Sequence, residues 1–243
     1  FEVQDLGYEG VVLTNIMDWY DAKQAPFGTG AKRKEFPDAF TLAALLAYAA
    51  RNGVSVAVIS KDKDFDRACE LYNELLYFPS LPALTEAMLS ADKRVAQAKQ
   101  LIEKNTGLIV AEIEEEFPLL GFYHEVDPAD VEDVEVDNVK VGDISVIHIG
   151  GNEISIAFEA TVYYSAYVTA DDHSTASIDS SEDWYILWNE YRGTVNELTG
   201  ISGTAKLSVD SDWNKIERVV TFEIQEDDIF VEELPEEIFR KGE

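Results

Sequence analysis

The spacing of apolar residues changes near residue 130, and this change constrains the fold more than any other feature of the sequence. Before it, helical stretches alternate with β-branched runs. After it, apolar residues recur at every second position, as at Val134 and Val136 and again at Ile154 and Ile156. The first pattern indicates parallel strands with crossover helices, and the second indicates antiparallel strands. We therefore predict an α/β fold followed by an antiparallel β-rich domain.

Helix signals and β-branched runs set the elements of the first part. Pro37 is suited to the first turn of a helix, and Gly53 is typical of a helix end. The run from Val54 to Ile59 has the length and composition of a strand. The other elements that we expect are a strand at 7–14, a helix at 15–23, a helix at 64–74, a strand at 75–78 and a helix at 81–89.

These patterns also divide the chain. We predict an α/β domain at 1–90, a helical connector at 91–125 and an acidic antiparallel β domain of five to seven strands at 126–243. The sequence begins at Phe1 without an initiator Met, so we expect it to be a fragment of a longer protein.

Negative charge is distributed unevenly along the chain. Residues 1–105 hold 15 acidic and 12 basic side chains, a net of -3, whereas residues 106–243 hold 33 acidic and 7 basic, a net of -26. A salt-adapted protein would be acidic in both parts, so the asymmetry favours two domains with different partners. The acidic part is expected to repel nucleic acid and to bind a basic protein or a second copy of the chain.

Cysteine usage and hydropathy indicate the cellular compartment in which the chain is expected. Cys69 is the only cysteine, so the chain cannot form an internal disulfide. The sequence has no run of 18 apolar residues, so we expect no transmembrane helix and no membrane partner. Together these features favour a cytoplasmic location.

Two acidic residues are candidates for metal chemistry. Asp38 follows Pro37 at the start of one predicted helix, and Asp62 follows the strand that ends at Ile59. A right-handed crossover places the start of the helix and the end of the strand at the same sheet edge. Grouped carboxylates need a cation, and their hard oxygen atoms select Mg²⁺ or Mn²⁺. The alternative is that each Asp only caps a helix.

The sequence around these residues resembles a PIN domain. The resemblance rests on three segments: Pro26-Phe27, then Lys32 to Phe40, and then Val56 to Phe65. It is closest to a bacterial PIN subfamily with a Lys-rich, Glu-Phe-Pro-Asp-Ala helix start. In PIN domains, an Asp at a helix start and another in a Ser-x-Asp-x-Asp-Phe segment bind the metal.

The resemblance assigns roles to individual residues. It implies that Asp38 and Asp62 are catalytic metal ligands, that Asp64 is an auxiliary ligand and that the Ser60 hydroxyl orients the site. PIN domains also use an Asp on their first strand and a Glu on an early helix. Asp5 and Glu9 are poorly placed to replace them, so the sequence resembles only the C-terminal half of the domain.

Basic and aromatic residues give further candidates for RNA binding. Lys32, Arg33 and Lys34 precede Asp38 and are suited to binding RNA phosphates, or they form a solvated loop that balances nearby acids. A group of tyrosines in the β domain has either a base-stacking or a cross-strand packing role, and its acidic setting favours packing. The group consists of Tyr163, Tyr164 and Tyr167.

The leading function implied by the resemblance is that of a metal-dependent endoribonuclease, with RNA as the substrate of the PIN half. PIN nucleases of bacteria act as toxins or in phage defence, and either role suits this chain. The fragment alone is expected to be inactive because two acids are missing. The alternative function is a non-catalytic assembly or regulatory module whose acidic β domain docks a basic protein partner.

Overall fold

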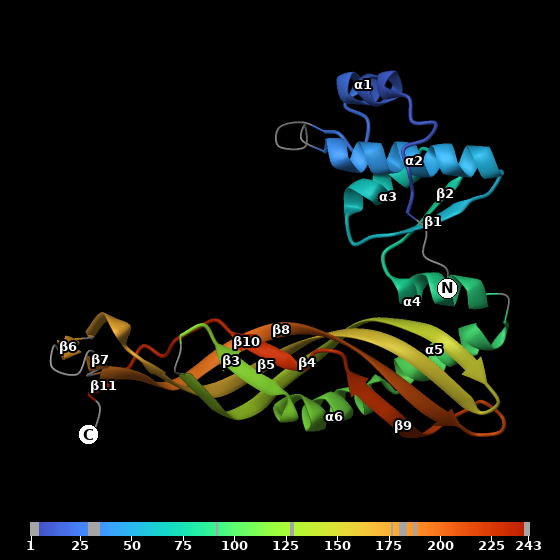
Figure 1. The fold of residues 1–243 in the computed structure, drawn as a ribbon. Coiled ribbons are helices and arrows are strands. Elements are labelled where there is room, and N and C mark those ends of the chain that lie inside the picture. Colours follow the sequence, from blue (N-terminus) through green and yellow to red (C-terminus); the bar gives the residue numbers. More distant parts are fainter. Residues whose placement is uncertain are drawn as a thin grey trace. The chain divides into compact units, whose positions relative to one another are not determined.

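The computed structural model describes the chain in seven segments, which are residues 5–28, 35–90, 92–126, 129–175, 177–179, 184–186 and 189–240. The chain forms two compact units, of which the first ends at Met88 and the second begins at Leu89 (Figure 1). Each unit has its own hydrophobic core.

The first unit is an α/β unit with a two-stranded sheet. Its elements are α1 (Leu13–Ala22), α2 (Phe36–Asn52), β1 (Val56–Ile59), α3 (Lys63–Cys69), β2 (Leu75–Phe78) and α4 (Leu81–Leu89). Strands β1 and β2 are parallel, with Val56 opposite Leu75, and α3 connects them. The prediction of parallel strands joined by a crossover helix is confirmed.

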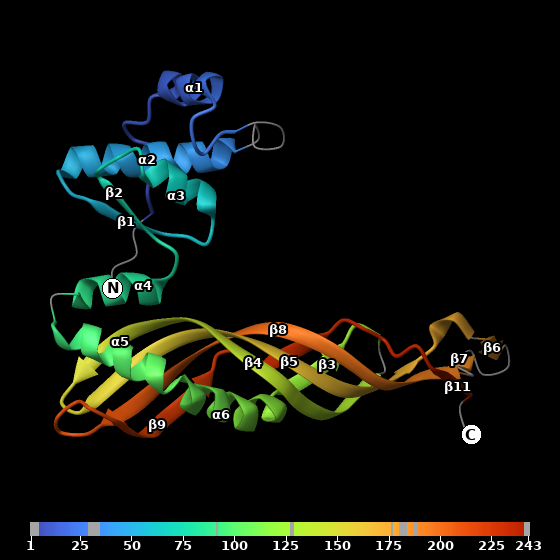
Figure 2. The same ribbon diagram turned by 180° about the vertical axis from the view of Figure 1, so that it is seen from behind.

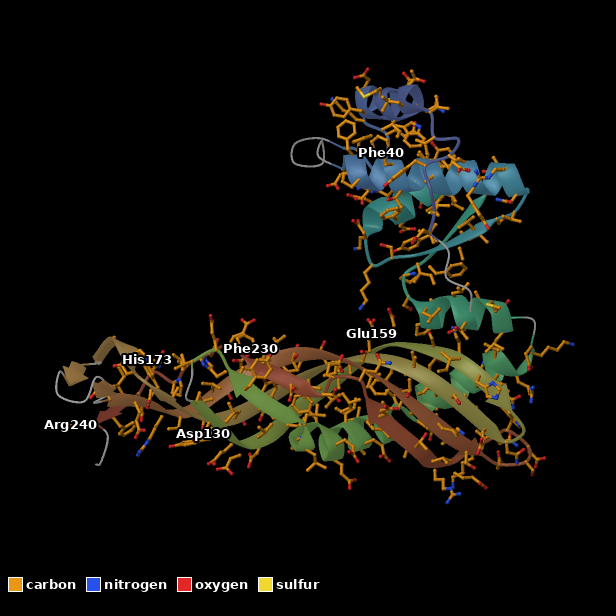
Figure 3. The ribbon with its side chains drawn as sticks, viewed as in Figure 1. Phe40, Asp130, Glu159, His173, Phe230 and Arg240 are labelled. Carbon is orange, nitrogen blue, oxygen red and sulfur yellow. The ribbon has the colours of Figure 1, made fainter. Side chains whose placement is uncertain are left out.

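Helix α2 organises this unit because its small and apolar residues pack on two sides. Leu42 packs with Val58 of β1 and Ala68 of α3 in one core cluster. Ala39 packs with Ile16 of α1 in another. Figure 3 shows side chains gathered between α1 and α2, where Phe40 is labelled. The helix ends as the sequence predicts, with Gly53 in the left-handed region at φ 63°.

The strand predicted at 7–14 is wrong. The described part of this segment is irregular up to the start of α1 at Leu13, and the Val11 backbone N–H donates to the Tyr8 carbonyl in a turn. A strand needs a neighbour to satisfy its backbone groups, and among the described residues β1 and β2 pair only with each other. The helix predicted at 64–74 also ends early, at Cys69.

The second unit is built on a long antiparallel sheet. Strands β4 (Ala129–Gly150), β5 (Glu153–Asp171) and β8 (Asn189–Val209) lie side by side in that order. On the edge opposite β5, β8 pairs with β11 (Ile238–Arg240) near its start and with β9 (Ile216–Ile224) near its end. These five strands confirm the antiparallel β-rich fold.

Shorter elements complete this unit. They are α5 (Arg94–Lys104), α6 (Thr106–Glu116), the 3₁₀ helix η2 (Phe117–Leu119), β3 (Gly121–His124), η3 (His173–Thr175), β6 (Ser177–Asp179), β7 (Trp184–Ile186) and β10 (Asp228–Val231). Strands β3 and β10 form a parallel pair, and β6 and β7 form an antiparallel pair.

Helices α5 and α6 pack on the sheet. Figure 2 shows them running along the long strands. Leu101 and Ile102 of α5 and Ile113 of α6 share one buried cluster with Ile156 of β5 and Leu207 of β8. Residues 91–125, predicted as a connector, therefore contribute to the core of the second unit.

Candidate metal-binding site

Asp62 lies at the start of α3, where its side chain caps the helix. One carboxylate oxygen, Oδ1, accepts a hydrogen bond from the Asp64 backbone N–H at 2.7 Å. The Ser60 hydroxyl oxygen in turn accepts from the Asp62 backbone N–H at 3.1 Å. The segment from Ser60 to Asp62 is thus held by local hydrogen bonds, and the Asp62 carboxylate remains exposed.

Tyr77 fixes the same segment from β2, a contact that the sequence analysis missed. Its hydroxyl donates to the Ser60 carbonyl oxygen at 2.6 Å. The Ser60 backbone N–H donates to the Phe78 carbonyl oxygen at 3.1 Å, which extends the β1–β2 pairing by one step. Burial raises the pKa of Tyr77, and the charges of Asp66 and Asp62 raise it further, so the hydroxyl keeps its proton.

Asp64 has a different environment from Asp62, although only one residue separates them. Its side chain is 8% exposed and forms an ion pair with Arg67, which is 54% exposed. The carboxylate is thus neutralised from within its own helix. Sequence spacing contains the signal for this pair, because residues three apart lie on one face of a helix.

Asp38 lies in the first turn of α2 and is half-buried. In Figures 1 and 2, the first turns of α2 and α3 lie at the same end of this unit. The first turn of α2, which holds Asp38, and the start of α3, which Asp62 caps, therefore lie at one end of the first unit.

Glu9 does not lie at the end of the unit that holds Asp38 and Asp62. Its carboxylate pairs with Arg51 in the last turn of α2 at 3.2 Å. Asp38 lies 13 residues before Arg51 in the same helix, so the two positions are about 20 Å apart along the axis. Over the described segments, no group of three or more His, Cys, Asp or Glu side chains is arranged to hold a metal ion.

The donor chemistry of the two remaining acids fits a hard divalent cation. Asp38 and Asp62 provide carboxylate oxygens, which Mg²⁺ and Mn²⁺ prefer, and both side chains are accessible to solvent. A complete site needs further oxygen ligands, which the described residues of this unit do not bring to the same place.

The predicted phosphate-binding residues Lys32, Arg33 and Lys34 lie outside the described residues. Among the tyrosines of the β domain, Tyr164 is buried and packs against Phe117 and Phe122, with ring centroids 5.2 and 5.8 Å away. The packing interpretation therefore holds for this tyrosine.

Comparison with known proteins bears on the first unit. The PIN domain family model matches residues 3–65, a segment that includes Asp38, Ser60, Asp62 and Asp64. The match is consistent with a PIN-domain fragment, and the PIN domain is a nuclease-type family that generally uses divalent metal ions. Searches of curated proteins and of solved structures give no match. No helix in the described ranges is long and apolar enough to cross a bilayer.

Proposed function

We propose that the first unit contributes Asp38 and Asp62 to a divalent-metal site that hydrolyses phosphodiester bonds in RNA. The observation that carries this proposal is the placement of both acids at helix starts on one end of a segment that matches the PIN domain. The protein would then act as a metal-dependent endoribonuclease of PIN type, with Mg²⁺ or Mn²⁺ as the cofactor.

Asp62 is the better defined of the two proposed ligands. Its Oδ1 atom caps α3, and the carboxylate has a second oxygen for a cation. Ser60 and Tyr77 act as positioning residues, because their hydrogen bonds fix the segment that carries Asp62. A bound divalent cation would lower the pKa of a water molecule and stabilise charge on the phosphoryl group.

The other proposed residues have supporting roles. Asp64 is an auxiliary ligand only when its ion pair with Arg67 opens. Lys32, Arg33 and Lys34 would bind RNA phosphates before Asp38. The remaining carboxylates must come from residues outside the described part of this unit.

The cytoplasm is the proposed location of this activity. RNA is available in the cytoplasm, and the single buried thiol of Cys69 suits that reducing compartment. A toxin or a phage-defence effector would be a suitable role for such a ribonuclease.

Manganese binding tests the ligand assignment without requiring catalysis. In NMR spectra of the chain, Mn²⁺ should broaden the backbone signals near Asp38 and Asp62. Asp62→Asn keeps the helix cap but removes the charge, so broadening should be lost while α3 stays folded. Asp62→Ala should also lose the cap, at a cost of about 1 kcal/mol in stability. Asp18→Asn, at an exposed position of α1, is the matched control and should bind Mn²⁺ normally.

RNA cleavage tests the activity. In a protein that supplies the missing carboxylates, Mg²⁺-dependent cleavage should fall by orders of magnitude in Asp62→Asn and should persist in Asp18→Asn. Normal cleavage by Asp62→Asn would overturn the assignment. If Mn²⁺ broadens no signal near Asp38 or Asp62 and no cleavage occurs, the first unit is a structural remnant. The protein is then a non-catalytic assembly or regulatory module. The neutralisation of Asp64 by Arg67 and of Glu9 by Arg51 favours that second function.

A further inference from the structure

The two-stranded sheet of the first unit has an apolar face that lies outside the core. Side chains alternate between the two faces of a strand, and Val58 and Leu75 point into the core with α2 and α3, where they are 7% and 3% exposed. The alternate residues point the other way, and Ile59 and Leu76 are 44% and 49% exposed. The other residues of this open face are Ala57 and Phe78.

An open face is unusual for parallel strands. Parallel sheets are normally covered on both faces, and for that reason their strands are apolar almost throughout. The sequences of β1 and β2, Val-Ala-Val-Ile and Leu-Leu-Tyr-Phe, have this composition. The open face therefore indicates a surface that another polypeptide covers.

Helix α4 provides a second exposed apolar surface in the same unit. None of its residues is buried, although the helix is rich in Leu and Ala. Leu81 and Met88 are 61% and 77% exposed, and Leu84 lies on the same side, because positions three and seven residues apart share a helix face. Only two residues separate the end of β2 from the start of α4, so the helix begins beside the open face (Figure 1).

We propose that a second copy of this chain covers both surfaces, with α4 of each copy packed on the open face of the other. A two-fold dimer needs a patch that is complementary to itself, and a helix face beside a sheet face on one chain meets that need. Packing an apolar helix on a parallel sheet is also the usual arrangement inside α/β domains. The two surfaces contain fewer residues than the roughly 20–30 per partner of a standard interface, so we expect a dissociation constant in the micromolar range.

Charge favours these surfaces over the acidic domain for contact between two copies. Residues 1–105 have a net charge of -3, whereas residues 106–243 have a net charge of -26 and repel the same region of another copy. The residues of the open face and of the α4 face are all uncharged, so their contact removes no charge from water. A different apolar partner would leave the purified chain monomeric, which makes the oligomeric state the deciding measurement.

Sedimentation velocity of the full chain tests the proposal. At physiological salt, the 27.2 kDa chain should shift from monomer to dimer between about 1 and 100 μM. Raising NaCl from about 0.05 to 0.5 M should strengthen the dimer, because salt screens the repulsion between the acidic domains and leaves an apolar contact intact. A chain that stays monomeric over this range, or a dimer that salt dissociates, would overturn the proposal.

Variants identify the surfaces in contact. Leu76→Thr keeps strand propensity and Met88→Gln keeps helix propensity, while each removes an exposed apolar side chain. Each should weaken the dimer at least about tenfold, because a symmetric contact loses the buried side chain in both copies. The matched controls are Leu198→Thr on β8 and Leu108→Gln on α6, whose native side chains are 61% and 37% exposed. Both controls should dimerise normally.

The proposed contact needs both surfaces. Unchanged dimerisation in either Leu76→Thr or Met88→Gln would therefore overturn it, and so would an equal loss in the controls. Far-UV circular dichroism checks that the variants stay folded, and the salt dependence of the unaltered chain tests the proposal without any variant.

One further variant separates this proposal from the proposed nuclease function, on which it does not depend. Asp62→Asn should lose metal binding and dimerise as the unaltered chain does, because it changes neither apolar surface. Loss of dimerisation in Asp62→Asn would contradict an apolar contact that is independent of the metal site.

Discussion

The buried carboxylate of Asp64 pairs with the guanidinium of Arg67 one turn later on α3. Asp62, two residues earlier, is exposed and uses one oxygen as a helix cap. The two acids of the Ser-x-Asp-x-Asp segment therefore have separate physical roles. Asp64 is neutralised by its own helix, whereas Asp62 retains a free charge at the end of the unit.

Removal of Arg67 should destabilise the first unit. Arg67→Ala leaves the Asp64 carboxylate buried without its cation, which costs about 3–5 kcal/mol for a fully buried pair. Because the Arg67 side chain is half-exposed, we expect a smaller loss of about 1–2 kcal/mol. Hydrogen exchange of the α2 and β1 amides would measure this loss.

The control for this prediction is Arg51→Ala, which breaks an exposed pair with Glu9. It should cost less than about 1 kcal/mol. Equal losses in the two variants would show that the burial of Asp64 contributes nothing to stability.

Tyr77 should matter for metal binding more than for folding. Tyr77→Phe removes the hydrogen bond to the Ser60 carbonyl oxygen and loosens the segment that carries Asp62. One such bond contributes about 0.5–1.5 kcal/mol, so Mn²⁺ affinity should fall about two- to tenfold. The measurement is a Mn²⁺ titration followed by NMR.

Tyr72→Phe is the matched control for Tyr77→Phe. The Tyr72 hydroxyl accepts a hydrogen bond from the Gln24 side-chain amide at 2.9 Å and does not contact Ser60. This variant should reduce stability and leave Mn²⁺ affinity unchanged. A similar fall in affinity for both variants would indicate a general loss of stability.

Elements fixed by local signals could be predicted from the sequence. Pro37 and Gly53 bracket α2 within one residue of its observed ends, because helix termini depend on nearby backbone groups. The segment at 7–14 was predicted as a strand from its β-branched residues, but a strand also depends on a neighbour that sequence patterns do not reveal.

In the candidate site, too, only the features that depend on local sequence could be predicted. The motif predicts Asp38 and Asp62 as ligands, and both residues lie at helix starts, as the sequence indicates. The contact from Tyr77 to Ser60 depends on the β1–β2 register, which pairs Val58 with Tyr77. The burial of Asp64 depends on packing across the unit. Neither the Tyr77–Ser60 contact nor the burial of Asp64 can be predicted from local sequence.

Gly203 illustrates a tertiary requirement in the long sheet. A Cβ atom there would lie 2.4 Å from Cζ of Phe158 and 2.5 Å from the carbonyl oxygen of Glu223. We expect Gly203→Ala to destabilise the second unit by about 1–3 kcal/mol, because both neighbours are held in the sheet. Gly200→Ala on the same strand, where a Cβ meets nothing within 4 Å, should be close to neutral in urea unfolding. Equal unfolding midpoints would contradict this account of Gly203.

Tyr164 should make stability depend on alkaline pH. Its pKa is about 12 in the folded protein, whereas an unfolded tyrosine loses its proton near pH 10. Between these values deprotonation favours the unfolded state, so the folded protein loses stability as the pH rises. From pH 9 to pH 11 this loss should be about 1.4 kcal/mol relative to Tyr164→Phe. Urea unfolding of both proteins at the two pH values measures it, and an equal difference at both would show that the folded protein does not protect this hydroxyl from ionisation.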